Sequence, residues 1–357
     1  MTAWRVRAAA LPGGDAVDAG ISGAGSWTSR PAPGAELLPG RFVLPGLVDA
    51  HCHLSVGQTG DGQPVALDAA AARANAARAR SAGVTAIRDT GSPGSVTLGL
   101  LPTPDGAGLL ACGRFLAPPG QYYPGLYAPV PAADLVGAAL AEVAAGARWV
   151  KLIADFPVLR PGEAAPDPAP TYPLADVRRL VQAVHAAGAR VAAHATTRQV
   201  TGLIDAGIDS VEHGTALTEA DLSALAARGG AWTPTLCATI GADLTRSDPD
   251  RRKRRHELRE RLSSLLPDAA RRGVTIMTGT DVVGTIPREV ALLAGLGLPP
   301  QAALAAASTA ARRFLGFAAG IQHGEPADLV SYDNDPRDDP AVLAHPAAVF
   351  AGGIRIA

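Results

Sequence analysis

The feature that most constrains the fold of this chain is a regular alternation of short apolar segments with longer helical segments between residues 46 and 316. The apolar segments have the length and composition of buried strands. They lie at residues 47–53, 85–89, 109–116, 149–153, 190–194, 210–213, 231–236 and 275–281. Strands that alternate with helices form parallel sheets, because each helix returns the chain to the start of the next strand. The alternation therefore predicts an α/β domain.

The helical segments between and after these strands complete the pattern. They are predicted at residues 65–82, 133–145, 174–187, 219–227, 250–272, 287–294 and 300–315. Roughly 270 residues with eight strands match the usual size of a (β/α)₈ TIM barrel. An open doubly wound sheet would more often carry a Gly-rich phosphate turn after its first strand, and no such turn follows residues 47–53. We predict a barrel over residues 46–316.

The two ends of the chain have a different pattern. Residues 1–45 and 317–357 contain short β-like pieces that Gly, Pro and Asp interrupt, as in hairpins and turns. Domain termini often lie close together. We therefore expect the two ends to form one small β-sandwich domain beside the barrel.

Composition excludes several classes of partner. The 357 residues carry 32 basic and 33 acidic side chains, so no overall field attracts nucleic acid or an acidic membrane. The longest apolar runs are shorter than the ~20 residues of a membrane span, and the run before Pro12 is too short for a signal-peptide core. We expect a cytoplasmic enzyme with a small-molecule substrate and three reduced core cysteines. Self-association into a homo-oligomer stays open.

The strand at residues 47–53 ends in His51-Cys52-His53. Because side chains alternate along a strand, His51 and His53 point to the same face and Cys52 points to the other. Two imidazoles on one face are half of a metal site. The alternative interpretation of this pair alone is two hydrogen-bonded core histidines.

Polar side chains close several of the other predicted strands. Lys151 interrupts an otherwise apolar strand, where an unpaired ammonium would be costly to bury. Active sites of TIM barrels lie at the carboxyl ends of the strands. The barrel therefore predicts that one group of side chains converges at this face: His51, His53, Lys151, His194, His213 and Asp281.

These residues and their neighbours resemble the amidohydrolase superfamily in its binuclear, carboxylated-lysine form. The resemblance covers nearly the whole chain. It rests on residues 45–53, 150–152, 193–195, 212–214, 279–281 and 327–330. Residues 210–214 and 233–236 are most similar to the branch of imidazolonepropionase-like enzymes and metal-dependent Xaa-Pro dipeptidases.

The resemblance implies two divalent metal ions. His51, His53 and Asp281 would bind the deeper ion, His194 and His213 the second, and a carbamate on Lys151 would bridge them. Nitrogen and oxygen ligands without thiolate suit Zn²⁺, while Mn²⁺, Co²⁺ and Fe²⁺ follow the same ligand logic.

Such a pair of cations would lower the pKa of a bridging water toward ~7 and so supply hydroxide. Asp281 would move the proton to the leaving nitrogen. The expected reaction is hydrolysis of a C–N amide bond in an N-acyl amino acid, an Xaa-Pro-like dipeptide or a cyclic amide. One alternative is hydrolysis of a lactone, carbamate or phosphotriester at the same centre. Another is a catalytically silent scaffold of the same fold.

Substrate contacts are expected just after the strands. Arg88 could pair with a substrate carboxylate, or it could form an internal pair with Asp89 or another acid. The loop after residues 109–116 departs from the Gly-His-rich segment expected in the dipeptidase branch. The candidate contacts are Arg88, Gln121, Tyr122, Tyr123 and Thr235.

Overall fold

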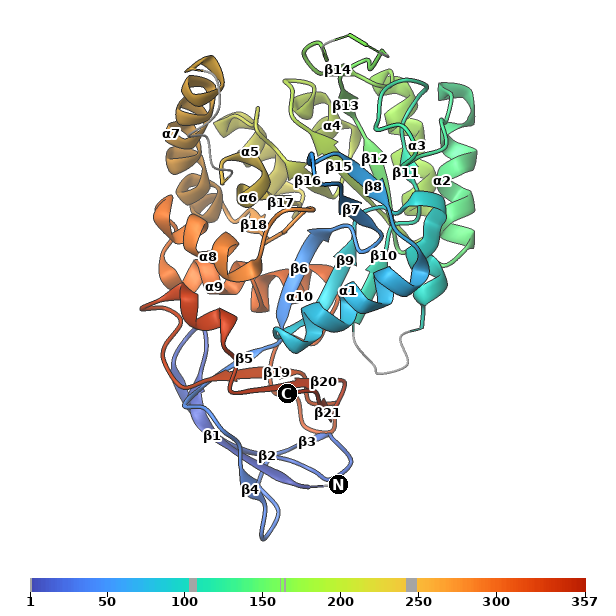
Figure 1. The fold of residues 1–357 in the computed structure, drawn as a ribbon. Coiled ribbons are helices and arrows are strands. Elements are labelled where there is room, and N and C mark those ends of the chain that lie inside the picture. The colour runs from blue at the N-terminus through green and yellow to red at the C-terminus, as the bar shows by residue number, and fades with distance from the viewer. Residues whose placement is uncertain (1, 103–107, 161, 164, 242–248) are drawn as a thin grey trace.

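The computed structural model describes residues 2–102, 108–160, 162–163, 165–241 and 249–357. Figure 1 shows a larger region of strands surrounded by helices and a smaller sheet that contains both chain ends. The predicted α/β class is confirmed. Among the described residues, no helix is both long enough and apolar enough to cross a membrane.

The larger region is built on parallel strands. A three-stranded sheet has the order β10, β9, β6, and a six-stranded sheet has the order β11, β12, β15, β16, β17, β18. Their bounds are β6 (Leu47–Cys52), β9 (Val84–Asp89), β10 (Gly108–Ala111), β11 (Phe115–Leu116), β12 (Trp149–Ile153), β15 (Arg190–Ala195), β16 (Ser210–His213), β17 (Ala231–Thr233) and β18 (Thr275–Ile276). The strand expected at residues 109–116 is thus divided into β10 and β11.

The two sheets are connected at both edges, by the continuous chain at one edge and by backbone hydrogen bonds at the other. β10 and β11 follow one another along the chain, so the same segment pairs with β9 and with β12. At the other edge the amide of Ala50 donates to the carbonyl of Thr278 at 2.9 Å, and the amide of Asp281 donates to His51 at 2.7 Å. The segment that carries Asp281 is thereby held beside the strand that carries His51.

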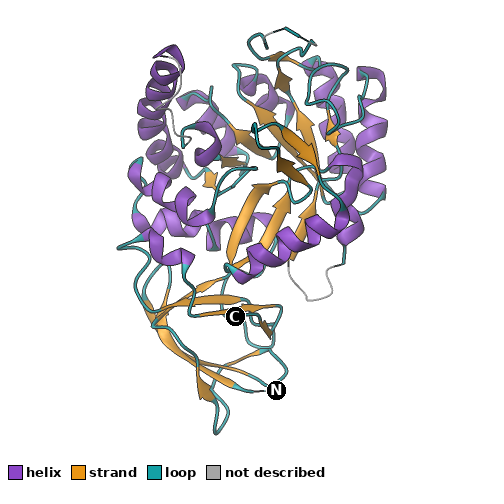
Figure 2. Cartoon of the chain, viewed as in Figure 1, coloured by secondary structure: helices purple, strands orange, loops and turns teal. Residues whose placement is uncertain are grey.

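Helices lie around these strands (Figure 2). They are α1 (Ala69–Ser81), α2 (Leu135–Ala144), α3 (Leu174–Ala186), α4 (Val200–Ala206), α5 (Glu219–Ala227), α6 (Leu236–Thr239), α7 (Pro249–Arg272), α8 (Ile286–Gly295), α9 (Pro300–Ala306) and α10 (Thr309–Leu315), with 3₁₀ turns η1 (Pro93–Leu100), η2 (Ala132–Asp134) and η3 (Pro340–Ala344). In α3 the buried side chains are Val177, Leu180, Val181 and Val184, the spacing of one helical face. That face packs against the strands.

The first helix begins later than the sequence suggests. Val65 and Ala66, predicted as the start of the helix, lie in β8 (Pro64–Ala66), which pairs antiparallel with β7 (Val56–Gln58). α1 begins only after Asp68, whose carboxylate accepts a hydrogen bond from the amide of Ala71 at 2.8 Å. This N-cap satisfies a backbone donor that the first helical turn would leave unpaired.

The strands of the two chain ends form one eight-stranded sheet. They are β1 (Trp4–Ala10), β2 (Asp15–Ile21), β3 (Trp27–Thr28), β4 (Glu36–Leu37), β5 (Phe42–Pro45), β19 (Leu329–Tyr332), β20 (Ala348–Ala351) and β21 (Ile354–Arg355). β5 pairs with β1 on one side and with β19 on the other. The expected association of the two ends is therefore present, around a small core of its own that includes Trp27 and Phe350.

Candidate metal centre

One cavity contains all six side chains that the sequence predicts as metal ligands. It has a volume of about 470 Å³ and lies at the carboxyl ends of the parallel strands. The lining ligand candidates are His51, His53, Lys151, His194, His213 and Asp281. The structure therefore brings together residues that are spread over the sequence from β6 to the segment after β18.

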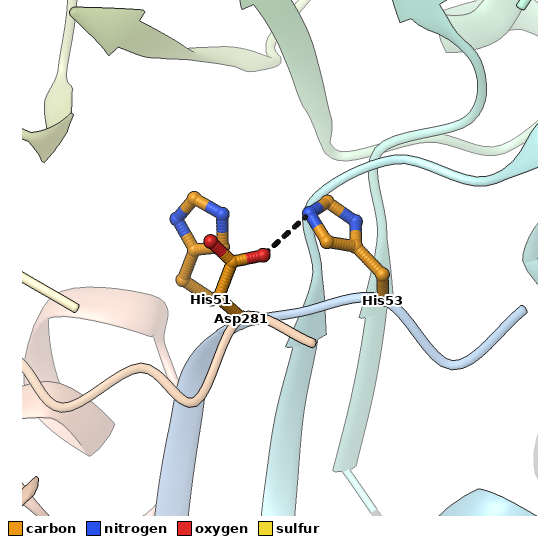
Figure 3. Close-up of side chains that lie close together, drawn as sticks. All are labelled: His51, His53 and Asp281. Atoms are coloured by element: carbon orange, nitrogen blue, oxygen red, sulfur yellow. Dashed lines mark ion pairs between the residues drawn. The ribbon is translucent and has the colours of Figure 1, made fainter. Parts of the chain in front are cut away.

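Three of these residues form a tight group (Figure 3). The ligand atoms of His51, His53 and Asp281 all lie within 4.8 Å of one another. The Nε2 atom of His53 is 3.5 Å from a carboxylate oxygen of Asp281, and the two imidazole rings are nearly perpendicular, at 88°. The predicted common face of the two histidines is confirmed, because both rings line the same cavity.

The remaining two histidines lie against this group. The rings of His194 and His213 have centroids 4.5 Å apart, and the ring of His213 is 4.9 Å from that of His51. His194 is the penultimate residue of β15 and His213 ends β16, and these strands are neighbours in a parallel arrangement. Neighbouring parallel strands end at the same edge of the sheet, which explains why the two rings meet.

In three of the imidazoles, the ring nitrogen Nδ1 has a hydrogen-bond partner elsewhere in the chain. The Nδ1 atom of His51 lies 2.7 Å from Glu212, that of His53 lies 2.9 Å from the carbonyl of Gly91, and that of His213 lies 2.7 Å from the hydroxyl of Thr235. A partner on Nδ1 fixes the orientation of the ring and leaves Nε2 for a ligand. Glu212 and the backbone at Gly91 therefore orient the first pair of histidines.

Burial keeps these imidazoles neutral. It holds the pKa of His51 and the pKa of His213 well below the ordinary imidazole value, and it lowers the pKa of His194 to about 4. A neutral ring at pH 7 has a free lone pair, which a cation requires. The site is thus ready to bind a metal without first losing protons from these rings.

Lys151 lies in the middle of β12 and is almost completely buried, with 1% of its surface exposed. Its Nζ atom has no hydrogen-bond partner within the described parts of the chain. Burial lowers the pKa of this ammonium group below its ordinary value. A buried amine without a partner, aimed into a cavity of histidines, is the strongest indication that the site holds a further group.

Several residues in and beside this site have a strained backbone conformation. Among the described residues other than glycine, positive φ angles occur at Ser95 and at three residues of this site: His213 (65°), Thr235 (45°) and Asp281 (55°). Such conformations are costly for residues with a Cβ and persist where the surroundings impose them. At β16 the left-handed residue lets His213 turn into the cavity directly after Glu212.

The structure places the candidate substrate contacts in different surroundings, and only some of them line the cavity. Tyr122 and Tyr123 line the cavity. Gln121 does not, because its amide donates to the carbonyls of Phe156 and Pro170 in the neighbouring loops. Thr235 is fully buried and contacts His213 instead of the cavity.

The position of Arg88 contradicts the expectation that its guanidinium lies at the mouth of the cavity and binds substrate. Its side chain is 0% exposed and donates to Glu212 at 2.7 Å and to the carbonyl of Ala50 at 2.7 Å. The guanidinium also lies over the ring of Trp149, 4.5 Å from its centroid. Of the two interpretations of Arg88, the structure has the internal pair, formed with Glu212 and not with Asp89.

The sequence interpretation missed Glu212 and two arginines of the cavity wall. Glu212 lies in a buried strand, so the reasoning that singled out Lys151 also applies to it. Arg255 on α7 and Arg288 on α8 line the cavity from helices. Neither carries a sequence signal, because a basic residue on an exposed helix normally faces solvent.

The chain is similar in sequence to known proteins over almost its whole length. The amidohydrolase family model matches residues 42–355. Uncharacterised proteins of Mycobacterium tuberculosis and Mycobacterium bovis are each 36% identical over 360 residues, which is 98% of this chain and 94% of the relative.

Solved structures share the whole fold. A Xaa-Pro dipeptidase with methionine bound in its active site has a TM-score of 0.82 and 22% identity, and 99% of each chain is covered. A putative prolidase from Bifidobacterium longum has a TM-score of 0.80 and 25% identity over 99% of this chain and 94% of that one. The ochratoxinase of A. niger has a TM-score of 0.80 and 18% identity over 99% and 95%.

Proposed function

The chain belongs to the amidohydrolase family, and from this premise we propose that it is a metal-dependent hydrolase that cleaves the C–N amide bond of a small substrate. An N-acyl amino acid, an Xaa-Pro-like dipeptide or a cyclic amide fits this role. The observation that carries the proposal is the convergence of all six ligand candidates on one cavity. The likeness to the Xaa-Pro dipeptidase and the putative prolidase supports it.

The proposed scaffold is a closed (β/α)₈ barrel over residues 46–316, with the termini, residues 1–45 and 317–357, forming a small β-sandwich. The hydrogen bonds of Ala50 with Thr278 and of Asp281 with His51 support closure, since they join the edges that an open sheet would leave unpaired. Closure explains why a residue after β18 meets a residue of β6 at the site.

The donor set fits two divalent cations. His51, His53 and Asp281 would hold one, and His194 with His213 would hold the other. Lys151 would bridge them after its neutral amine has added to CO₂, forming a new N–C bond and releasing a proton. Burial lowers the pKa of Lys151, which shifts its protonation toward the neutral amine that this addition requires. Nitrogen and oxygen ligands suit Zn²⁺.

Divalent cations, when bound here, lower the pKa of water toward neutrality and polarise a substrate carbonyl. The role of the chain is to place the groups that surround the reacting bond. Asp281 is the most exposed member of its ligand group, with 22% of its side chain accessible. Its backbone is held by the hydrogen bond that its amide donates to the carbonyl of His51. Its carboxylate takes the proton of the attacking water and passes it to the leaving nitrogen.

The test combines metal analysis with a substrate panel. Protein purified without chelator is analysed for bound elements and then assayed on N-acyl amino acids, dipeptides, cyclic amides, lactones, carbamates and phosphotriesters. We expect stoichiometric divalent metal and amide hydrolysis. Preferential turnover of the esters would favour the alternative chemistry, and bound metal without turnover of any class would favour the silent scaffold.

The proton-transfer role has a separate test in Asp281→Asn. This variant should keep most of the bound metal and lose roughly 10²–10⁴-fold in kcat. A kcat near the wild-type value would contradict the role. Metal content, measured on the same sample, separates loss of the proton carrier from loss of the ligand.

A further inference from the structure

The walls of the cavity differ in chemical character. One wall is aromatic: Phe115, Tyr122, Tyr123 and Phe156 line it. The ring of Tyr122 is 4.8 Å from that of Phe115 and 5.1 Å from that of Phe156, measured between centroids. These rings come from β11, from the loop after it and from β13 (Asp155–Phe156), which follows β12.

The other wall is cationic. Arg255 on α7 and Arg288 on α8 line the same cavity, and the Nη2 atom of Arg288 donates to the neutral carbonyl of Gly241. Within the described residues, no carboxylate lies at ion-pair distance from Arg288. Among the described residues, the only acidic side chain that lines the cavity is that of Asp281, which belongs to the proposed metal site.

The two walls face each other across the strands. Along the six-stranded sheet β11 and β12 are at one end and β17 and β18 are at the other. The aromatic residues lie in β11, in the loop after it and just after β12, whereas α7 leads into β18 and α8 follows it. Figure 1 shows α7 and α8 on the opposite side of the strands from α2 and α3, which follow β11 and β12.

We propose that this cavity binds its substrate in one direction, with a carboxylate held by Arg288 and a bulky apolar acyl group against Tyr122 and Phe156. The inference rests on the proposed function, because the amide between the two groups lies over the ligand cluster. Guanidinium groups bind carboxylates through paired hydrogen bonds. Aromatic rings bind apolar groups of similar size. The substrate class is therefore an N-acyl amino acid with a large acyl part and a free carboxylate.

The kinetic test uses matched substrates. N-phenylacetyl derivatives of glycine, leucine, proline and phenylalanine are compared with their carboxamides, and release of phenylacetate is measured. The wild-type enzyme should prefer the carboxylates. Arg288→Gln should lower kcat/KM for the carboxylates roughly 10- to 100-fold, mainly through KM, and should leave the carboxamides unchanged.

Arg254→Gln is the matched control. Arg254 is exposed on the same helix as Arg255 and does not line the cavity. It should have wild-type kinetics on both series. Equal use of carboxylates and carboxamides by the wild-type enzyme would overturn the proposal, as would an equal loss on both series in Arg288→Gln.

Binding without turnover separates this inference from the proposed function. The D-isomer of N-phenylacetyl leucine and its carboxamide are titrated into metal-loaded protein by calorimetry. Tighter binding of the carboxylate, lost in Arg288→Gln but kept in Arg254→Gln, would support the orientation even if no amide were hydrolysed. Equal affinity for both ligands would overturn it while leaving the hydrolase proposal intact.

Discussion

Two buried arginines make the same kind of ion pair at opposite ends of β6 and β9. Arg88 is 0% exposed and Arg312 is 1% exposed. Arg88 pairs with Glu212 at 2.7 Å, and Arg312 pairs with Asp328 at 2.5 Å. Each guanidinium also lies near an aromatic ring, Trp149 for Arg88 and Phe317 for Arg312. The local chemistry is nearly identical.

The acids of the two pairs have different second partners. The other oxygen of Glu212 contacts Nδ1 of His51, so the Arg88–Glu212 pair is connected to a ligand candidate. The other oxygen of Asp328 accepts from the hydroxyl of Thr85, at the start of β9. Arg312 also donates to the carbonyl of Gly46, just before β6.

The position of each pair along the strands therefore determines its role. The Arg88 pair lies at the carboxyl ends and orients the site. The Arg312 pair lies at the amino ends and connects the parallel strands β6 and β9 to Asp328, next to β19 of the terminal sheet. In barrel enzymes the carboxyl ends carry the chemistry and the opposite face contributes stability.

The largest expected effect is that of Arg88→Met. It leaves the carboxylate of Glu212 buried without its cation, which typically costs ~3–5 kcal/mol of the unfolding free energy.

The conservative variant Glu212→Gln keeps the shape of the pair and should weaken metal binding by roughly 10- to 100-fold, because the orientation of His51 is lost. Urea unfolding and metal content after dialysis measure the two effects. Undiminished metal affinity in Glu212→Gln would disprove its role in positioning His51.

Arg312→Met should have a smaller effect and a different signature. Asp328 is 17% exposed, so water solvates part of the charge that the substitution leaves unpaired. We expect a loss of ~1–3 kcal/mol in unfolding free energy. Metal content and kcat of the folded enzyme should stay at wild-type values. If Arg312→Met lost metal as readily as Glu212→Gln, the division of roles between the two ends would be wrong.

The sequence singled out the ligand candidates because each was expected at or near the carboxyl end of a predicted strand. Alternation placed His51 and His53 on one face, and the cost of a buried ammonium singled out Lys151. The amidohydrolase resemblance drawn from these motifs is confirmed by the family match. These inferences needed only local pattern and the rule that parallel strands end at one edge.

Alternation along a strand could not predict the surroundings of the ligands. It would send Glu212 and His213 to opposite faces, yet the left-handed backbone at His213 lets both contribute to the site. The partner of Arg88 depends on the register of strands that are 124 residues apart. The pairing of β5 with β19 depends equally on contacts between the two chain ends. Such long-range geometry has no signal in a single short segment.

Glu289 extends the comparison to a buried carboxylate that has two backbone amides in place of a guanidinium. It accepts hydrogen bonds from Leu236 at 3.0 Å and Cys237 at 2.5 Å, at the start of α6. Burial raises the pKa of Glu289 to about 7 from 4.5, although these amides oppose the rise. Without a cation, desolvation outweighs the hydrogen bonds.

The smallest expected effect is the pH dependence that Glu289 contributes. Between pH 4.5 and about 7 the folded state binds more protons at this group than the unfolded state does. Its contribution to stability is therefore fully present below pH 4.5 and is lost as the pH rises toward 7. Unfolding free energies of wild type and Glu289→Gln, measured across this range, should differ in slope by up to ~1.4 kcal/mol per pH unit. Parallel curves would mean that the two amides compensate for burial as fully as a guanidinium does.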